Sequence, residues 1–209
     1  MVKLYYTSTS CGAANFITAF LSGINIEAEQ VDLPTHKTAS GVDFYTVNPK
    51  GNVPTLVLDD GKILNENAAT LQYIADLDST HKLLPAAGEV SRYEVLNALS
   101  YVGSEYHKSV GNLFNPTISA EVKAFFLEQI AAKLTHLNTS LLKDKTYLVG
   151  EQLSIADVYL YICLSWSGYL GLDLSPYPNV QSFFQRVGDL EGIKGAHAAM
   201  ATSPTNTAA

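Results

Sequence analysis

The spacing of apolar side chains divides the N-terminal part of the chain into alternating strands and helices. Short apolar runs bounded by turn residues predict four strands, at 2–6, 26–31, 54–58 and 62–64. Helical spacing predicts one helix that begins near Gly12 and ends at Gly23, and a second helix that Asn65 caps. The order of these elements predicts a small sheet with helices packed on it.

The hydrophobic pattern becomes helical further along the chain. Residues 78–88 contain the turn residues Asp78, Ser79, Pro85 and Gly88 and predict an exposed linker, with 81–87 as the segment between the two domains. Ser154-Ile155-Ala156-Asp157 has the pattern of a capping box, with Asp in place of the usual Glu, and the helix after it is apolar on all sides. We expect that helix at the centre of a bundle. The sequence therefore predicts an α/β domain at 1–80 and an all-helical domain at 88–209.

One predicted helix after the linker carries a narrow stripe of small and polar residues. Its members follow one another at steps of three or four: Asn97, Ser100, Ser104, His107 and Gly111. A solvated helix face normally carries Lys and Glu, so this stripe favours close approach by a ligand or another helix; a solvated face is the alternative. His107 titrates near neutral pH unless its surroundings shift it, and is either a proton-transfer group or a structural histidine.

Composition and charge narrow the classes of function. The chain has 209 residues, and 47% are hydrophobic, which is enough for one large or two small packed domains. A formal net charge of −7 argues against a nucleic-acid partner. No apolar run reaches the length of about 20 residues that a membrane helix needs. The N-terminus shows no secretory signal. From the charge and the apolar runs we expect no nucleic-acid or membrane partner, and from the two widely separated cysteines we expect a cytoplasmic protein.

The cysteines are the candidate reactive side chains. Cys11 and Cys163 are the two in the chain, and their wide separation argues against a disulfide framework. The five histidines are scattered without metal-ligand spacing, so we predict no metal site. Cys11 lies where the first strand gives way to a helix, and the positive end of a helix dipole favours a thiolate. A small, buried and inert cysteine is the alternative.

Several short motifs carry a family resemblance. They are Lys3-Leu4-Tyr5-Tyr6-Thr7 before Cys11, Asn48-Pro49-Lys50-Gly51-Asn52-Val53-Pro54, Leu64-Asn65-Glu66, Ser104-Glu105-Tyr106-His107-Lys108, the Ser154–Asp157 box and Leu172-Asp173-Leu174. Over nearly the whole chain they resemble the cytosolic glutathione S-transferases, and specifically the bacterial beta class. The resemblance implies the glutathione S-transferase fold: an α/β thioredoxin-like N-terminal domain followed by an all-α helical-bundle C-terminal domain.

The resemblance also implies a glutathione site. A loop that ends in Val53 and Pro54, joined by a cis peptide bond, would offer the backbone of Val53 to the extended glutathione peptide. Glu66 and Asn67 open a helix, and their N–H groups would receive the γ-glutamyl carboxylate. The Glu66 side chain is alternatively a complement to the helix dipole. Counter-charges for the glycyl carboxylate would come from His36 and Lys37.

The same resemblance assigns groups to the reacting atoms. We predict that Cys11, Ser10 and His107 are catalytic donors near the glutathione sulfur, and that Ser104 binds glutathione together with His107. The second-substrate pocket is predicted to have an apolar wall formed by Leu113, Phe114, Trp166 and Tyr169.

Three functions are compatible with these residues. The leading hypothesis is a homodimeric detoxification transferase that conjugates glutathione, as a co-substrate and not a permanently bound cofactor, to small apolar electrophiles. The second is glutathione-dependent thiol transfer or reduction through a mixed disulfide on Cys11, which glutathione itself must resolve because no second cysteine is nearby. The third is a non-catalytic protein that binds apolar ligands.

Overall fold

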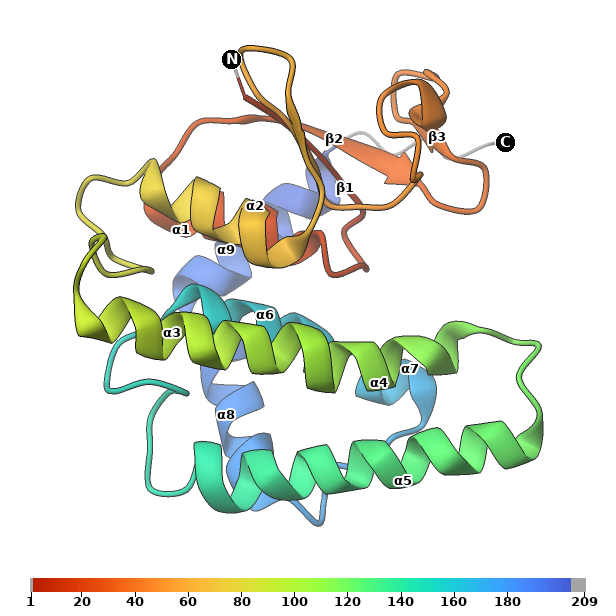
Figure 1. Ribbon diagram of the computed structural model, residues 1–209, viewed down its shortest axis with the longest axis vertical. Coiled ribbons are helices and arrows are strands. Elements are labelled where there is room, and N and C mark those ends of the chain that lie inside the picture. Colours follow the sequence, from red (N-terminus) through yellow and green to blue (C-terminus); the bar gives the residue numbers. More distant parts are fainter. Residues whose placement is uncertain (1, 204–209) are drawn as a thin grey trace. The chain divides into compact units, whose positions relative to one another are not determined.

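The computed structural model describes residues 2–203, and the chain forms two compact units. One unit combines the residues up to Leu84 with the segment that starts at Leu190, and the other spans Pro85–Asp189. Each unit is a folded body with its own secondary structure (Figure 1).

A five-stranded sheet forms the centre of the first unit. Its strands are β1 (Lys3–Tyr6), β2 (Glu27–Asp32), β3 (Lys37–Thr38), β4 (Thr55–Val57) and β5 (Ile63–Leu64), in the order β3-β2-β1-β4-β5. β1 pairs in parallel with β2 and antiparallel with β4. The four predicted strands are confirmed. The short β3 was not predicted, because two residues are too few to show an alternating pattern.

Two helices of this unit lie side by side, α1 (Ala13–Ser22) and α2 (Asn67–Asp76) (Figure 1). The predicted stop of α1 is confirmed, since Gly23 has a φ of 67° and its N–H caps the helix. The predicted cap of α2 is wrong by one residue: the N-cap is Glu66, while the Asn65 side chain donates to Asn48 Oδ1 at 3.3 Å. A side-chain contact elsewhere in the fold thus competes with the capping role that the sequence favoured.

The last helix, α9 (Glu191–Thr202), also belongs to the first unit and packs against α1. Gly192 and Gly195 lie against Leu21 and Phe20 of α1, where an added Cβ would come within 2.4 and 3.2 Å of those side chains. Gln30 of β2 donates to the carbonyl of Met200 at 3.1 Å. The sequence placed residues 88–209 in one helical domain, whereas the structure groups α9 with the unit that contains the sheet, where it packs on α1. The pattern of an amphipathic helix does not say which partner covers its apolar face.

The second unit is helical. It contains α3 (Val90–Tyr101), α4 (Lys108–Gly111), α5 (Ala120–His136), α6 (Ile155–Ser165), α7 (Ser167–Leu170) and α8 (Pro178–Asp189), with π-helical turns η2 (Val102–His107) and η4 (Leu137–Leu141) and a 3₁₀ turn η3 (Asn112–Phe114). The run from α3 to α4 lies beside α5 (Figure 1). Within residues 2–203, none of the helices is both long and apolar enough to cross a membrane.

Helix α6 is the core of the second unit. Every residue from Ile155 to Leu164 is buried, which confirms the expected central helix. The predicted capping box is also confirmed: Asp157 accepts from the Ser154 N–H at 2.9 Å and from the Ser154 hydroxyl at 2.6 Å. Asp157 also accepts from the N–H of Leu148 at 2.8 Å, so the box ties α6 to the preceding loop. The start of α6, and thus the position of its side chains, is fixed by three hydrogen bonds.

Candidate functional site

Ser10 shapes the turn between β1 and α1. Its hydroxyl donates to the carbonyl of Thr7 at 2.9 Å and accepts from the N–H of Gly12 at 3.1 Å. The hydroxyl is therefore engaged on both sides within the turn. Gly12 is needed here because an added Cβ would lie 3.2 Å from both Ser10 Oγ and Tyr6 Cβ. These contacts bring Cys11 to the N-terminus of α1, as the sequence predicted.

The Cys11 thiol lies against the loop before β4. Its Sγ donates to the carbonyl of Val53 at 3.5 Å, and Val53 and Pro54 are joined by a cis peptide bond. Burial raises the pKa of Cys11 to about 11, against the opposing effects of a hydrogen bond from Asn67 and of the N–H groups of Cys11 and Gly12. The direction of this shift is opposite to the one that a helix N-terminus alone would favour. Desolvation outweighs the helix terminus, and Cys11 is a thiol at neutral pH.

Asn48 holds the loop that carries Val53. Its side-chain N–H₂ donates to the Asn52 carbonyl at 3.0 Å and to Thr55 Oγ1 at 2.9 Å, while its Oδ1 accepts from the N–H of Lys50 at 3.1 Å. The side chain is almost completely buried, at 1% exposure. Asn48 belongs to the motif that carried the resemblance, but its role as the internal support of the loop was not predicted. A buried Asn with several partners is hard to infer from sequence, because the partners surround it only in the folded loop.

Asn67, at the start of α2, connects this helix with α1 and with the Cys11 turn. It is buried, and its Oδ1 accepts from Asn15 Nδ2 of α1 at 2.7 Å. Its side chain also forms the hydrogen bond to Cys11 that opposes the rise of the thiol pKa. Asn15 was not predicted as a site residue, because a lone buried Asn within an apolar helical pattern gives no sequence signal of its own.

Glu66 is the N-cap of α2, and its side chain makes no capping hydrogen bond. The carboxylate instead pairs with Lys50 Nζ at 3.1 Å, and both side chains are exposed. The first N–H groups of α2 therefore point out of the helix end without a side-chain cap from Glu66, which is the arrangement that binds anions at helix N-termini.

His36 and Lys37 lie at the other edge of the sheet, on β3 and just before it. His36 has a φ of 51°, and its ring centroid is 4.4 Å from that of Tyr45. Gly51 has a φ of 66° and leaves room for this pair, because an added Cβ would lie 2.6 Å from Tyr45 and 3.0 Å from His36. Lys37 is exposed. Among the described residues, no hydrogen bond joins His36 or Lys37 to the Cys11 turn.

In the second unit, the π-helical turn η2 ends at His107. A π turn is wider than an α turn, so it changes the direction in which side chains of the predicted stripe point. Asn97, Ser100 and Ser104 are exposed, and the Ser104 hydroxyl donates to the Ser100 carbonyl at 2.8 Å. His107 is partly buried, and burial, with a smaller effect of Lys108, lowers its pKa to about 4. The imidazole is therefore neutral at pH 7.

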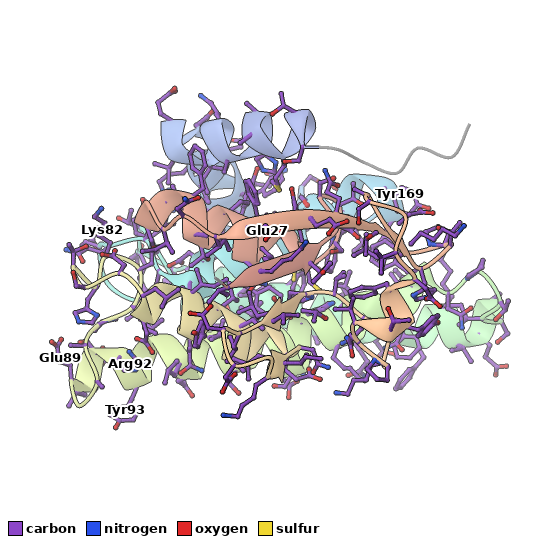
Figure 2. All side chains as sticks on the ribbon, turned by 90° about the horizontal axis from the view of Figure 1, so that it is seen from above. Glu27, Lys82, Glu89, Arg92, Tyr93 and Tyr169 are labelled. Carbon is purple, nitrogen blue, oxygen red and sulfur yellow. The ribbon has the colours of Figure 1, made fainter. Side chains whose placement is uncertain are left out.

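Aromatic rings surround His107. Its Nδ1 lies 2.5 Å from the Tyr159 hydroxyl, and its ring centroid lies 5.1 Å from that of Trp166. Phe114 stands edge-on to Trp166 with centroids 5.4 Å apart and stacks on Tyr169 at 5.9 Å. Tyr169, which is labelled in Figure 2, is the most exposed ring of this group, at 84%. The structure thus brings three of the four predicted pocket residues together in one cluster with His107.

Leu113, the fourth predicted pocket residue, is partly buried in η3 next to Phe114. Tyr159 was not predicted as a site residue, because its position in an apolar helix is typical of core packing. Within residues 2–203, no group of three or more His, Cys, Asp and Glu side chains is placed to hold a metal ion.

Comparison with known proteins identifies the family. The N-terminal domain of glutathione S-transferases matches residues 12–77, and the C-terminal domain matches residues 98–191. The Escherichia coli O157:H7 protein named Glutathione S-transferase GstA is 35% identical over 195 residues, which cover 93% of this chain and 96% of that protein. The chain belongs to the glutathione S-transferase family.

Solved glutathione S-transferase structures share the fold. BphK, a bacterial enzyme solved as a ternary complex, has a TM-score of 0.90 and 43% identity, covering 95% of this chain and 99% of BphK. A sphingomonad glutathione S-transferase complexed with glutathione has a TM-score of 0.90 and 38% identity, covering 96% and 100%. The beta-class enzyme of Sphingomonas chungbukensis has a TM-score of 0.88 and 38% identity, covering 95% and 98%. The predictions of the fold, of a beta-class member and of a glutathione transferase enzyme are confirmed.

Proposed function

We propose that this glutathione S-transferase binds glutathione at the Cys11 turn and conjugates its sulfur to small apolar electrophiles. The observation that carries the proposal is the convergence of the Cys11 thiol, the Val53 carbonyl and the Asn67 side chain at the N-termini of α1 and α2. Glutathione is an extended peptide with a carboxylate at each end. A helix N-terminus and a loop backbone are the features that such a ligand requires.

The N-terminus of α2 would take the γ-glutamyl end. The N–H groups of Asn67 and the residues after it would receive the carboxylate, and the Glu66 carboxylate would attract the γ-glutamyl amine. Lys50 already pairs with Glu66 at 3.1 Å, so the amine would have to share or displace this exposed pair. Exposed ion pairs contribute little free energy, so replacing Lys50 by the amine as the partner of Glu66 would cost little. His36 and Lys37 remain our proposal for the glycyl carboxylate.

Cys11 would act as a hydrogen-bond donor and not as the nucleophile. A thiol with a pKa of about 11 keeps its proton at neutral pH, and it would turn this proton from the Val53 carbonyl to an anionic acceptor when one is bound. The acceptor would be the thiolate of glutathione, which is stabilised when donors converge on it. Ser10 would support this geometry by holding the turn, since its own hydroxyl donates to Thr7. His107 and Ser104 are proposed as further contacts of bound glutathione.

The aromatic cluster of Phe114, Trp166 and Tyr169 would bind the electrophile, with Leu113 beside it. Its rings offer apolar faces, and the exposed ring of Tyr169 is accessible to a ligand. A flat aromatic electrophile is the substrate that suits such a surface. The proposed mixed-disulfide chemistry at Cys11 is less well supported, because attack on a disulfide requires the thiolate form that burial disfavours.

We also propose a homodimer. On α3, Val90 is 75% and Tyr93 is 61% exposed, and both side chains line a groove of about 630 Å³ between α3 and the end of α5. Tyr93 points away from its helix (Figure 2). Apolar side chains exposed side by side are typical of a contact surface, and a second copy of the chain would cover them. Light scattering at several concentrations tests this, and a monomer throughout would contradict it.

The conjugation of glutathione to 1-chloro-2,4-dinitrobenzene tests the proposed site. We expect Cys11→Ala to lower the rate at saturating glutathione about tenfold, because one donor to the thiolate is lost. Cys163→Ala removes the other thiol, which is buried in the second unit, and is the matched control. An unchanged rate in Cys11→Ala would remove Cys11 from thiolate stabilisation. A wild-type protein that binds apolar ligands without turnover would contradict the proposed reaction.

A further inference from the structure

Tyr159 is the hydrogen-bond partner that the structure gives to His107. Its hydroxyl lies 2.5 Å from His107 Nδ1, and the two rings meet edge-on with centroids 5.6 Å apart and an interplanar angle of 79°. Tyr159 is 3% exposed and lies in the middle of α6, the helix that is buried along its length. The phenol is therefore a fixed group, whereas His107 lies on the partly exposed turn η2.

We propose that Tyr159 is a positioning residue, which donates its hydroxyl proton to His107 Nδ1 and so holds the imidazole as the tautomer that carries its proton on Nε2. His107 then presents an Nε2–H donor to the bound substrates. This inference rests on the proposed role of His107 in substrate binding.

The direction of the Tyr159–His107 hydrogen bond follows from the chemistry of the two groups. A neutral imidazole has one N–H donor and one nitrogen lone pair, and the lone pair is the stronger acceptor of the atoms in this contact. The phenol is the more acidic donor. When Nδ1 accepts, the proton of the neutral ring must be on Nε2.

The surroundings of His107 keep this arrangement in place. Burial disfavours the imidazolium form, in which both nitrogens would donate and Nδ1 would lose its acceptor role. The Trp166 ring lies 5.1 Å from the imidazole centroid and limits its rotation. Among the described residues, Tyr159 is the hydrogen-bond partner shown for the ring, which leaves Nε2 without one.

Gly111 lies beside the Nε2 edge of the His107 ring. Gly111 follows His107 by one helical turn, and a Cβ added to it would lie 3.9 Å from Nε2 and 3.8 Å from Cδ2. Any longer side chain at this position would extend over that edge of the ring. Because Gly111 has no side chain, no group from this position covers the Nε2 edge of His107.

Tyr159→Phe removes the hydroxyl and keeps the ring, so it tests the proposal directly. In spectra of ¹⁵N-histidine-labelled protein, assigned to His107 by comparison with His107→Gln, we expect the Nε2–H tautomer in the wild type and a mixture of tautomers in Tyr159→Phe. The turnover of glutathione with 1-chloro-2,4-dinitrobenzene should fall about fivefold to tenfold, the effect of one misdirected hydrogen bond. The KM for glutathione should change by less than about twofold, because the γ-glutamyl and backbone contacts are proposed to lie in the other unit.

Tyr161→Phe is the matched control, because it removes a hydroxyl from the same helix. Tyr161 stacks on Phe184 at 5.3 Å, and a Cβ added to Gly188 would lie 3.5 Å from its hydroxyl, so the Tyr161 ring packs against α8. We expect this variant to keep both the tautomer and the turnover of the wild type.

The outcomes separate the positioning role from the proposed function. An Nδ1–H tautomer in the wild type would overturn the proposal, and this result does not depend on whether a variant folds. A Tyr159→Phe protein with an unchanged tautomer and unchanged turnover would also overturn it. If His107→Gln retains full turnover, His107 has no part in the reaction, and the tautomer measurement still decides what Tyr159 does to the ring.

Discussion

The Cys11 turn and the His107 cluster hold their functional atoms by different means. At Cys11, the contacts come from the turn itself and from loops of the same unit, and several are backbone groups: the Val53 carbonyl and the N–H groups of Cys11 and Gly12. At His107, the contacts are side chains, a phenol and an indole that α6 and its end supply. The positions of backbone groups are set by the path of the chain, whereas contacts between side chains depend on how the helices pack.

Burial shifts the pKa values of Cys11 and His107 in opposite directions. It raises the pKa of Cys11 and lowers the pKa of His107, and in both cases it favours the neutral form. Each site therefore offers a neutral hydrogen-bond donor at pH 7, which suits the stabilisation of an anionic sulfur. The comparison teaches that Cys11 and His107 would both meet the glutathione sulfur as neutral hydrogen-bond donors, whereas the proposed charged contacts lie at the two ends of the peptide.

The largest effect is expected for His107. Its pKa of about 4 lies below the ordinary value of about 6.5, so the unfolded state binds more protons between these pH values. The contribution of the neutral His107 to the free energy of unfolding is therefore fully present above pH 6.5 and is lost as the pH is lowered towards 4. We expect this loss to be about 2 to 3 kcal/mol. Urea unfolding at pH 7 and pH 5 should show a smaller loss in His107→Gln than in the wild type.

The control for this pH dependence is His136→Gln, a substitution of an exposed histidine in the same unit. It should retain the pH dependence of the wild type. If His107→Gln and the wild type lose equal unfolding free energy between pH 7 and pH 5, His107 is not desolvated. The comparison with Cys11 would then not hold for His107.

The reactivity of Cys11 should show the next largest effect. With a pKa of about 11, its thiolate fraction at neutral pH is about 300 times smaller than that of an ordinary thiol. The greater nucleophilicity of a more basic thiolate offsets about tenfold of this, so alkylation should be about 30-fold slower than for a free cysteine. The rate of iodoacetamide modification in Cys163→Ala should rise about tenfold per pH unit from pH 7 to pH 10. A plateau below pH 8 would contradict the raised pKa.

A smaller effect is expected at Asn67, which joins α2 to α1. Asn67→Ala leaves the buried Asn15 side chain without its 2.7 Å partner and should lower the free energy of unfolding by about 1 to 2 kcal/mol. The double variant Asn15→Ala with Asn67→Ala removes both polar groups, so it should cost less than the sum of the single variants. If the losses of unfolding free energy in the two single variants add up to the loss in the double variant, the two side chains are not coupled. The Cys11 turn would then rely less on tertiary contacts than the structure indicates.

Parts of the fold and of the candidate site could be predicted because their signals are local. The four strands, the stop of α1 at Gly23 and the Ser154–Asp157 box depend on residues close together in sequence, and each is confirmed. Other features were missed for the opposite reason. The N-cap of α2 moved to Glu66 because Asn65 binds Asn48, and Tyr159 looked like a core residue because the pattern of α6 does not show which side chain meets His107.

The sequence by itself determined the order of elements, the place of Cys11 at a helix N-terminus and the family to which the chain belongs. Only the tertiary structure decided that Cys11 keeps its proton, that Tyr159 binds His107 and that α9 packs on α1 in the sheet-containing unit. Local patterns set backbone conformation because their hydrogen bonds close within a few residues. Desolvation and side-chain pairing depend on atoms brought together from distant parts of the chain, and no local pattern contains that information.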